Sequence, residues 1–250
     1  MKFSVLILLL NLGLFLSCKK ERPLVFSSES FTESKLELCK DISCPEITIN
    51  YVQVQGDSEA SEKINSEIIT FIISALHIED EGEPSAASIP EAVENFIKAY
   101  RMDSADFPDM SAEYFAEINI SESYNSKKLV SFQLQQFLYT GGAHGYQNNS
   151  FLNFNPQTGL ELPLESLFTD IENFTILANN RFREAHKIAK TESINSTGFW
   201  FEDDKFYLPE TIGITNEGLI LIYNQYEIAS YADGSIELEI PMEEAKKYMR

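Results

Sequence analysis

The sequence predicts an α+β protein with antiparallel sheets covered by helices, and its length allows one large domain or two small ones. Short runs of alternating apolar residues are joined by turn residues, as in β-hairpins. Segments with apolar residues at helical spacing lie between groups of these runs instead of after every one. A doubly wound parallel fold would need regular strand–helix alternation. An apolar content of 44%, with 12% aromatic residues, is enough for a packed core.

The first 17 residues have the form of an export signal. Lys2 supplies a short positive end, and residues 3–16 are mostly apolar. The apolar run is shorter than the roughly 20 residues that a membrane-spanning helix needs, and no later stretch comes closer. We therefore expect no helix that crosses a membrane.

The signal ends in Phe15-Leu16-Ser17-Cys18, which resembles the lipobox of bacterial lipoproteins. The resemblance implies cleavage before Cys18 and a diacylglyceryl thioether on its sulfur. The alternative is an ordinary signal peptide with a cysteine there by chance. Because two or three acyl chains form a stable anchor, we expect a cell-envelope protein held by lipid on a membrane outside the cytoplasm, with the outer membrane favoured.

The mature chain would be strongly acidic. Loss of Lys2 leaves 18 of the 19 basic side chains against 39 acidic ones, a formal charge of −21. Such a field repels nucleic acid, so no nucleic acid partner is expected. The same charge attracts cationic proteins and also keeps a tethered protein in solution, and composition alone does not separate these two roles.

Two cysteines remain once Cys18 is acylated. Cys39 and Cys44 form an even pair in an oxidising compartment, and we expect a disulfide that closes a small loop. A metal site is disfavoured, because zinc needs four nitrogen or sulfur ligands and no histidine lies near this pair. We expect neither a metal nor a cofactor.

Residues 18–45 are polar and lack clear periodicity, so we interpret them as the lipidated N-terminus and a tether. Residues 46–150 are expected to form an N-terminal lobe. Alternation slips at Gln135-Gln136, which predicts a β-bulge. The elements expected in this lobe are a strand near 47–51, a helix near 64–72, a helix that begins at a capping box of Ser88 and Glu91, and a hairpin of strands near 114–120 and 130–134.

Residues 151–250 are expected to form a C-terminal lobe. After a turn at 155–159, apolar residues at helical spacing predict the longest helix over 170–190, with His186 on its exposed face. Alternating runs predict short strands at 211–215, 219–223 and 236–240.

The loop at 139–146, between two predicted strands, is the most distinctive segment. Its three glycines allow positive φ or a close backbone approach, so it could present aromatic side chains to a ligand. Equally, the glycines can serve only the turn while His144 holds it by a hydrogen bond. The candidate ligand-binding residues are Tyr139, Gly141, Gly142, His144 and Tyr146, together with Trp200 from a later loop.

This loop and the segments 153–159 and 162–168 resemble a family of envelope domains of unknown function, and a later segment, 217–234, is similar to the same family. The resemblance covers about residues 45–245. Such domains form the outer part of lysozyme-sensing anti-sigma factors and accompany a catalytic domain in some peptidoglycan deacetylases. The resemblance implies a two-lobed α+β fold and a role at the cell wall, with a lysozyme-like cationic protein or a peptidoglycan component as ligand. We expect no deacetylase domain and no segment that holds a sigma factor.

No catalytic motif is present in the sequence. The three histidines are far apart, although distant ligands can converge, and a G-x-S-x-G elbow is absent. One alternative function is a cell-wall glycan hydrolase that uses carboxylates of Glu202-Asp203-Asp204 beside Trp200, since glycosidases flank the sugar bond with two carboxyls. With 39 acidic residues such clusters arise by chance, so we expect a non-catalytic binding or sensing module.

The lipobox predicts that cells fed labelled palmitate incorporate the label into this protein, and that Cys18→Ser abolishes it, because the thioether needs this thiol. Gel fluorography of the purified protein measures the label. The Cys39→Ser/Cys44→Ser double variant is the control and should stay labelled. Unchanged labelling of Cys18→Ser would contradict the lipobox.

Overall fold

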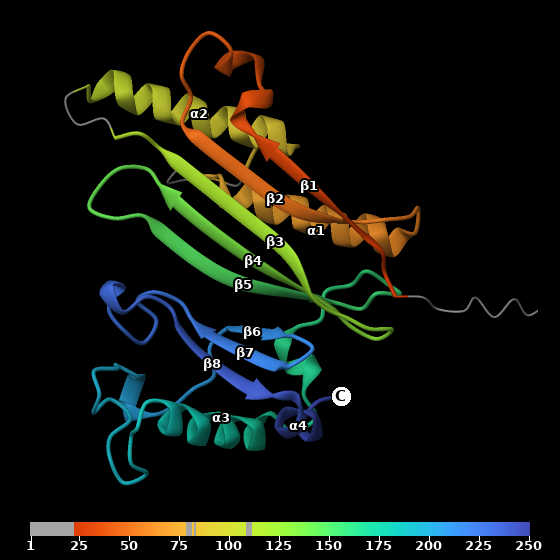
Figure 1. The fold of residues 1–250 in the computed structure, drawn as a ribbon, viewed down its shortest axis with the longest axis vertical. Coiled ribbons are helices and arrows are strands. Elements are labelled where there is room, and N and C mark those ends of the chain that lie inside the picture. The colour runs from red at the N-terminus through yellow and green to blue at the C-terminus, as the bar shows by residue number, and fades with distance from the viewer. Residues whose placement is uncertain (1–22, 79–81, 83, 109–111) are drawn as a thin grey trace, which may run out of the picture.

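The computed structural model describes residues 23–78, 82, 84–108 and 112–250. The export signal and Cys18 lie outside the described residues. Within the described part, the α+β fold in two lobes is confirmed. One sheet has the strand order β1-β2-β3-β4-β5, and the other has the order β6-β7-β8 (Figure 1).

The first lobe consists of the five-stranded sheet and two helices that cover one of its faces (Figure 1). Its core joins Ile72 and Phe96 of the helices to Phe132 of the sheet, all at most 1% exposed. The elements of this lobe are β1 (Phe26–Thr32), β2 (Glu46–Val54), α1 (Glu59–Ala75), α2 (Ile89–Asp106), β3 (Phe115–Asn125), β4 (Val130–Tyr139) and β5 (Tyr146–Phe154).

Helix α2 begins where the sequence predicted. Ser88 Oγ accepts the backbone N–H of Glu91 at 3.4 Å, which satisfies one of the free donors of the first turn. The return contact of the predicted capping box differs, because Glu91 Oε2 accepts the N–H of Ala87 at 2.8 Å.

The first sheet is mixed, and not antiparallel throughout as predicted. Strands β2 and β3 pair in parallel, with Glu46 beside Phe115, whereas the other strand pairs of this sheet are antiparallel. The chain between β2 and β3 contains α1 and α2. A long crossover of this kind is what parallel neighbours require.

Strand β1 lies within the segment that we predicted as a tether. It pairs antiparallel with β2, with Phe26 beside Val54, and Phe26 and Phe31 pack against the core. Its serines conceal the alternation in the sequence. In the loop that follows, Cys39 and Cys44 form a disulfide, and Arg101 Nη2 of α2 donates to Leu38 O at 3.0 Å. This part of the chain therefore belongs to the folded lobe.

The predicted bulge at Gln135-Gln136 is wrong. Strand β4 pairs with β3 without interruption there, and the register shift lies at Glu122/Tyr124 of β3. By alternation Gln136 shares a face of β4 with Leu134 and Leu138. A polar residue thus occupies an inward position without breaking the strand.

The second lobe consists of the three-stranded antiparallel sheet, with α3 and α4 on the side away from the first lobe (Figure 1). Phe174 and Phe182 of α3 are fully buried against this sheet. The elements of this lobe are α3 (Ile171–Ala185), β6 (Thr211–Ile214), β7 (Gly218–Tyr223), β8 (Ile236–Pro241) and α4 (Met242–Ala245).

Helix α3 ends five residues before the predicted Lys190. At 15 residues it is also shorter than α1 and α2, which have 17 and 18. Lys187 adopts φ 59°, a left-handed conformation that stops the helix. His186 is not on an exposed face as predicted. Its ring lies 4.4 Å from the Phe182 ring, between centroids, and burial lowers its pKa.

The two lobes meet along β5, whose side chains alternate between them. Leu152 packs into the core of the first lobe, whereas Asn149 and Phe151 contact the second lobe. The side chain of Asn224 forms two hydrogen bonds with the backbone of Asn149: Oδ1 accepts its N–H at 2.8 Å, and Nδ2 donates to its carbonyl at 2.9 Å. The amide therefore pairs with β5 as a neighbouring strand would.

Gly213 of β6 lies directly against the ring of Phe151. A Cβ atom at this glycine would be 2.1 Å from a ring carbon. The lobes can approach this closely only because position 213 has no side chain.

We expect Gly213→Ala to lower the free energy of unfolding by roughly 1–3 kcal/mol, the usual cost of overpacking, as measured by urea denaturation. Phe151→Leu should relieve part of that loss, because the smaller side chain leaves room for the added methyl. A double variant that is less stable than the sum of the single losses would contradict this contact.

Candidate functional site

A groove of about 470 Å³ lies between the lobes, where the β4–β5 loop meets the segment that follows β7. We call it the interlobe groove. The first lobe contributes the end of α1 and the β4–β5 hairpin, and the second lobe contributes residues 225–231. The lining residues are Ser74, Ala75, His77, Ile78, Gln136, Leu138, Thr140, His144, Gly145, Tyr146, Gln225, Tyr226 and Tyr231.

Aromatic rings connect the lobes across this groove. The His144 ring stacks on Tyr231, with 3.8 Å between centroids and 24° between planes. The Tyr226 hydroxyl lies 3.4 Å from His144 Nε2, and the Tyr231 hydroxyl donates to Gly145 O at 3.1 Å. The β4–β5 loop is thus held by the second lobe as well as by its own strands.

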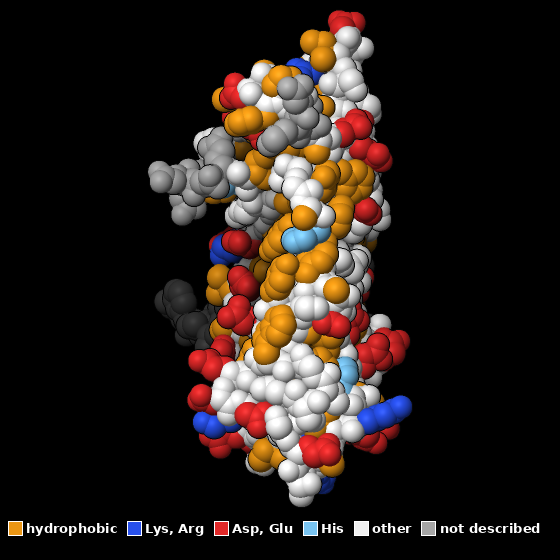
Figure 2. All heavy atoms as spheres, turned by 90° about the vertical axis from the view of Figure 1, so that its left-hand side faces the viewer, with side chains coloured by type: hydrophobic (Ala, Val, Ile, Leu, Met, Phe, Trp, Pro, Cys, Tyr) orange, Lys and Arg blue, Asp and Glu red, His pale blue; other side chains and the backbone are white. Residues whose placement is uncertain are grey.

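Two tyrosines of the groove remain accessible to a ligand. Tyr146 is 57% exposed and Tyr226 is 58% exposed. Figure 2 shows the face of the molecule that lies on the left in Figure 1. Hydrophobic side chains form a band along this face, and a histidine lies within the band. Among the described residues that line the groove, none has a carboxylate, an ammonium or a guanidinium group. The described part of the lining is therefore an aromatic and amide surface on an acidic protein.

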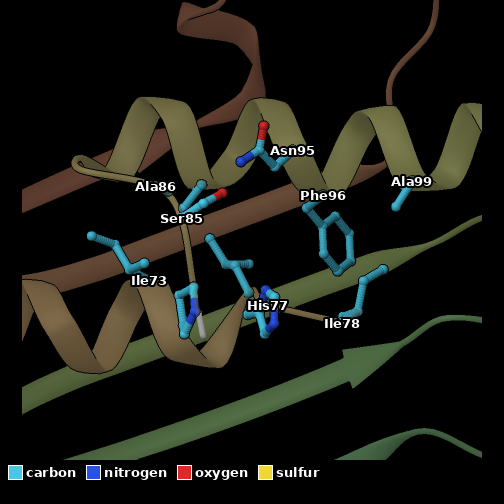
Figure 3. A pocket seen from close by; sticks show the side chains of 11 residues that line it. Ile73, His77, Ile78, Ser85, Ala86, Asn95, Phe96 and Ala99 are labelled. Atoms are coloured by element: carbon cyan, nitrogen blue, oxygen red, sulfur yellow. The ribbon is translucent and has the colours of Figure 1, made fainter. Parts of the chain in front are cut away.

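His77 lies on the far side of the groove, just after α1. Its Nε2 is 3.2 Å from Gly82 O. The same side chain lines a second, smaller cavity of about 20 Å³ between α1 and α2, together with Ile73 and Phe96 (Figure 3). That volume holds about one water molecule, so of the two spaces that His77 lines only the interlobe groove can hold a ligand.

Of the six predicted ligand-binding residues, His144 and Tyr146 line the groove. The other three residues of the loop shape it. Gly141 and Gly142 have φ of 95° and 88°, which other residues rarely adopt, and the Tyr139 hydroxyl donates to Gly142 O at 3.1 Å. His144 Nδ1 also lies 3.1 Å from Gly145 O. The glycines and His144 therefore serve the turn, and ligand binding by this loop stays a prediction.

Trp200 is not among the residues that line the groove. Its backbone N–H donates to Ile228 O at 3.0 Å, so it lies beside the segment that supplies Tyr226, and its side chain is 46% exposed. We therefore treat it as a neighbour of the site.

The groove residues that were not predicted as ligand-binding include Gln136, His77, Gln225, Tyr226 and Tyr231. Two signals existed: the polar side chain of Gln136 interrupts an apolar face of β4, and the last three residues lie in the family-like segment 217–234. Tyr226 and His144 are 82 positions apart, and no local pattern connects them.

Two of the three carboxylates considered for a hydrolase have partners close by in the sequence. Asp204 Oδ1 accepts from Ser193 Oγ at 2.5 Å, and Asp203 forms an ion pair with Lys205 at 3.6 Å. Phe201 beside them is only 2% exposed. In the described ranges we find no group of three or more His, Cys, Asp or Glu residues arranged for a metal ion, and no helix long and apolar enough to cross a membrane.

A carboxyl group lies close to the Asn149–Asn224 contact. Burial raises the pKa of Glu227, and the nearby charge of Glu210 adds to this, whereas a hydrogen bond from the N–H of Asn224 lowers it. Glu227 therefore ionises less readily in the folded protein than in the unfolded chain.

Comparison with known families places two matches in series along the chain. A model described as "Deacetylase PdaC" matches residues 38–147, and one described as "Protein of unknown function (DUF3298)" matches residues 165–243. The first covers most of the first lobe, and the second covers most of the second lobe. No curated protein matches this sequence.

Solved structures show the same fold. A DUF3298 family member from Bacteroides fragilis is 26% identical, with a TM-score of 0.69 over 91% of this chain and 94% of its own. A DUF3298 family protein from Pseudomonas aeruginosa PAO1 is 18% identical, with a TM-score of 0.65 over 92% and 96%. Both lobes and their arrangement are therefore shared with these proteins.

Glu227→Gln should stabilise the folded protein near pH 7, since it removes a charge that burial disfavours and keeps an oxygen to accept from Asn224. Because the folded-state pKa is raised, the parent loses stability as pH rises above the unfolded value of 4.5. The stability difference should vanish below that pH, as measured by thermal melts at several pH values. Glu239→Gln, at an exposed carboxylate, is the control, and a Glu227→Gln variant that is less stable near pH 7 would contradict this view.

Proposed function

Because the chain combines a PdaC N-terminal domain with a DUF3298 domain, we propose that it is a lipid-anchored binding or sensing module of the cell envelope, with a ligand in the interlobe groove. The lipid would be attached to Cys18, as its lipobox indicates. The proposed module carries out no reaction. Its two lobes together form one recognition surface.

The observation that carries this proposal is the composition of the groove. Ligand sites are typically concave and rich in aromatic side chains, with a few polar groups that orient the ligand. Here two exposed tyrosines lie beside the amides of Gln136 and Gln225. Both lobes contribute to this surface.

A component of peptidoglycan fits this lining better than a charged ligand does. Sugar rings have apolar faces that can pack on aromatic rings, and their hydroxyl and acetamido groups can bond to amide side chains. A charged ligand would lose its hydration in the groove without gaining an ionic partner among the described lining residues. We therefore propose a cell-wall glycan as the first candidate ligand of the groove.

A cationic protein of the lysozyme type is the second candidate, and the net charge of −20 favours it. In that case the acidic surface outside the groove would steer the partner, and the exposed tyrosines would supply desolvated contacts. Because exposed charges are screened over about 10 Å at 0.1 M salt and about 30 Å at 0.01 M, the two candidates differ in their salt dependence.

Tyr146→Ala should weaken binding by about tenfold or more, mainly through a faster off-rate, as expected for an aromatic contact of this kind. Its thermal midpoint should stay near that of the parent, because the side chain is 57% exposed. Surface plasmon resonance of the mature chain against soluble peptidoglycan fragments and against lysozyme measures this. Trp200→Ala is the matched control, since that aromatic is also exposed and lies outside the groove.

Salt concentration separates the two ligands in the same experiment. Association with lysozyme should slow steeply as salt rises, whereas association with a neutral glycan fragment should not. Loss of binding in Trp200→Ala but not in Tyr146→Ala would mean that the site lies elsewhere. Absence of binding to either probe would overturn the proposed function.

A further inference from the structure

The two ends of the first sheet differ in chemistry. The groove lies at the end where β4 finishes with Tyr139 and β5 starts with Tyr146. At the opposite end β1 begins at Phe26, and β3 turns into β4 (Figure 1). The described chain also enters the fold at this second end.

Hydrogen bonds hold the segments of this second end together. Asn125 Nδ2 at the end of β3 donates to Leu24 O at 3.0 Å, next to the start of β1. Gln157 Nε2, in the turn after β5, donates to Lys127 O at 3.0 Å. The chain entry and two turns therefore form one continuous surface.

This surface has two lysines and two exposed apolar side chains, whereas the protein as a whole is acidic. Lys127 and Lys128 are exposed in the β3–β4 turn, and Val25 and Leu160 are 65% and 57% exposed. We call these four residues the proximal surface. Of the acidic side chains near it, Glu161 directly follows Leu160 and is exposed, as is Asp57 in the β2–α1 turn. Glu59 is paired with Lys63 at 2.7 Å.

The lipid attachment point is close to this surface in the sequence. Six residues separate Cys18 from Val25, and Lys19, Lys20 and Arg22 are among them. At about 3.5 Å per residue, even a fully extended segment spans only roughly 25 Å. A lipid on Cys18 would therefore keep the proximal surface near the headgroups.

We propose that the proximal surface docks on the anionic lipid headgroups of the membrane that holds the chain. This inference rests on the lipid anchor of the proposed function. The lysines interact with the negative leaflet, and Val25 and Leu160 lie at its boundary. The groove is then held away from the membrane by the length of the sheet, roughly 33 Å for the 10 residues of β4.

Tryptophan quenching tests this orientation. Because Cys39 and Cys44 are joined, Cys18 of the mature chain can be coupled to a maleimide phospholipid, whether or not cells acylate it. Vesicles of 30% phosphatidylglycerol and 70% phosphatidylcholine, with brominated acyl chains, quench nearby indoles. The chain has a single tryptophan, Trp200. Leu160→Trp in a Trp200→Phe background should be strongly quenched, whereas the parent Trp200 should not.

Charge reversal tests the headgroup contact. Lys127→Glu/Lys128→Glu in the Leu160→Trp background should reduce quenching several-fold, since each lysine near an anionic surface contributes roughly fivefold in lipid affinity. Lys187→Glu/Lys190→Glu changes the net charge equally at exposed sites of the second lobe and should leave quenching unchanged. Equal quenching of the two tryptophan positions, or equal effects of the two charge reversals, would overturn the proposal. Groove variants such as Tyr146→Ala should not alter quenching, so failure of the groove proposal would be seen separately.

Discussion

The contact between β5 and the second lobe determines where every other feature of this protein lies. One face of β5 completes the core of the first lobe, its other face receives Gly213 of the second lobe, and its free edge receives Asn224. Neither contact tolerates much displacement, because the glycine approaches a ring directly and the amide forms two hydrogen bonds with the backbone. Two modest sheets are thereby fixed in one orientation, with Asn224 only two residues before Tyr226.

The groove follows from that orientation. Asn224 places the segment 225–231 against the β4–β5 loop, where His144 stacks on Tyr231. Neither lobe alone has the full set of rings. The described lining residues include no carboxylate, although the chain carries 39 acidic residues. In the proposed function, long-range attraction and short-range recognition are therefore assigned to different surfaces of the molecule.

Local patterns predicted the helices and most strands. Helix α2 has a capping serine and a stripe of apolar residues, and both act within one or two turns. Strand β1 could not be predicted, since its serines hide the alternation and its pairing depends on β2. The pairing of His144 with Tyr231 is a tertiary contact between loops. Gln136 gave a signal that was misinterpreted, because a polar residue on an inner face can mark a bulge or the wall of a groove. Only the fold distinguishes these two cases.

Because the groove is shared between lobes, ligand affinity and interlobe packing are thermodynamically linked. A ligand that contacts Tyr146 and Tyr226 together binds only to molecules in which the lobes are docked, and the affinity measured is reduced by the fraction that is undocked. Binding in turn shifts that equilibrium towards the docked state, by no more than the difference in affinity between the two states. If the first lobe is held on the membrane, the second lobe is the part free to respond. Ligand binding in the groove would then change the position and rigidity of residues 151–250 relative to the membrane. A sensing module of the envelope requires such a change in response to its ligand.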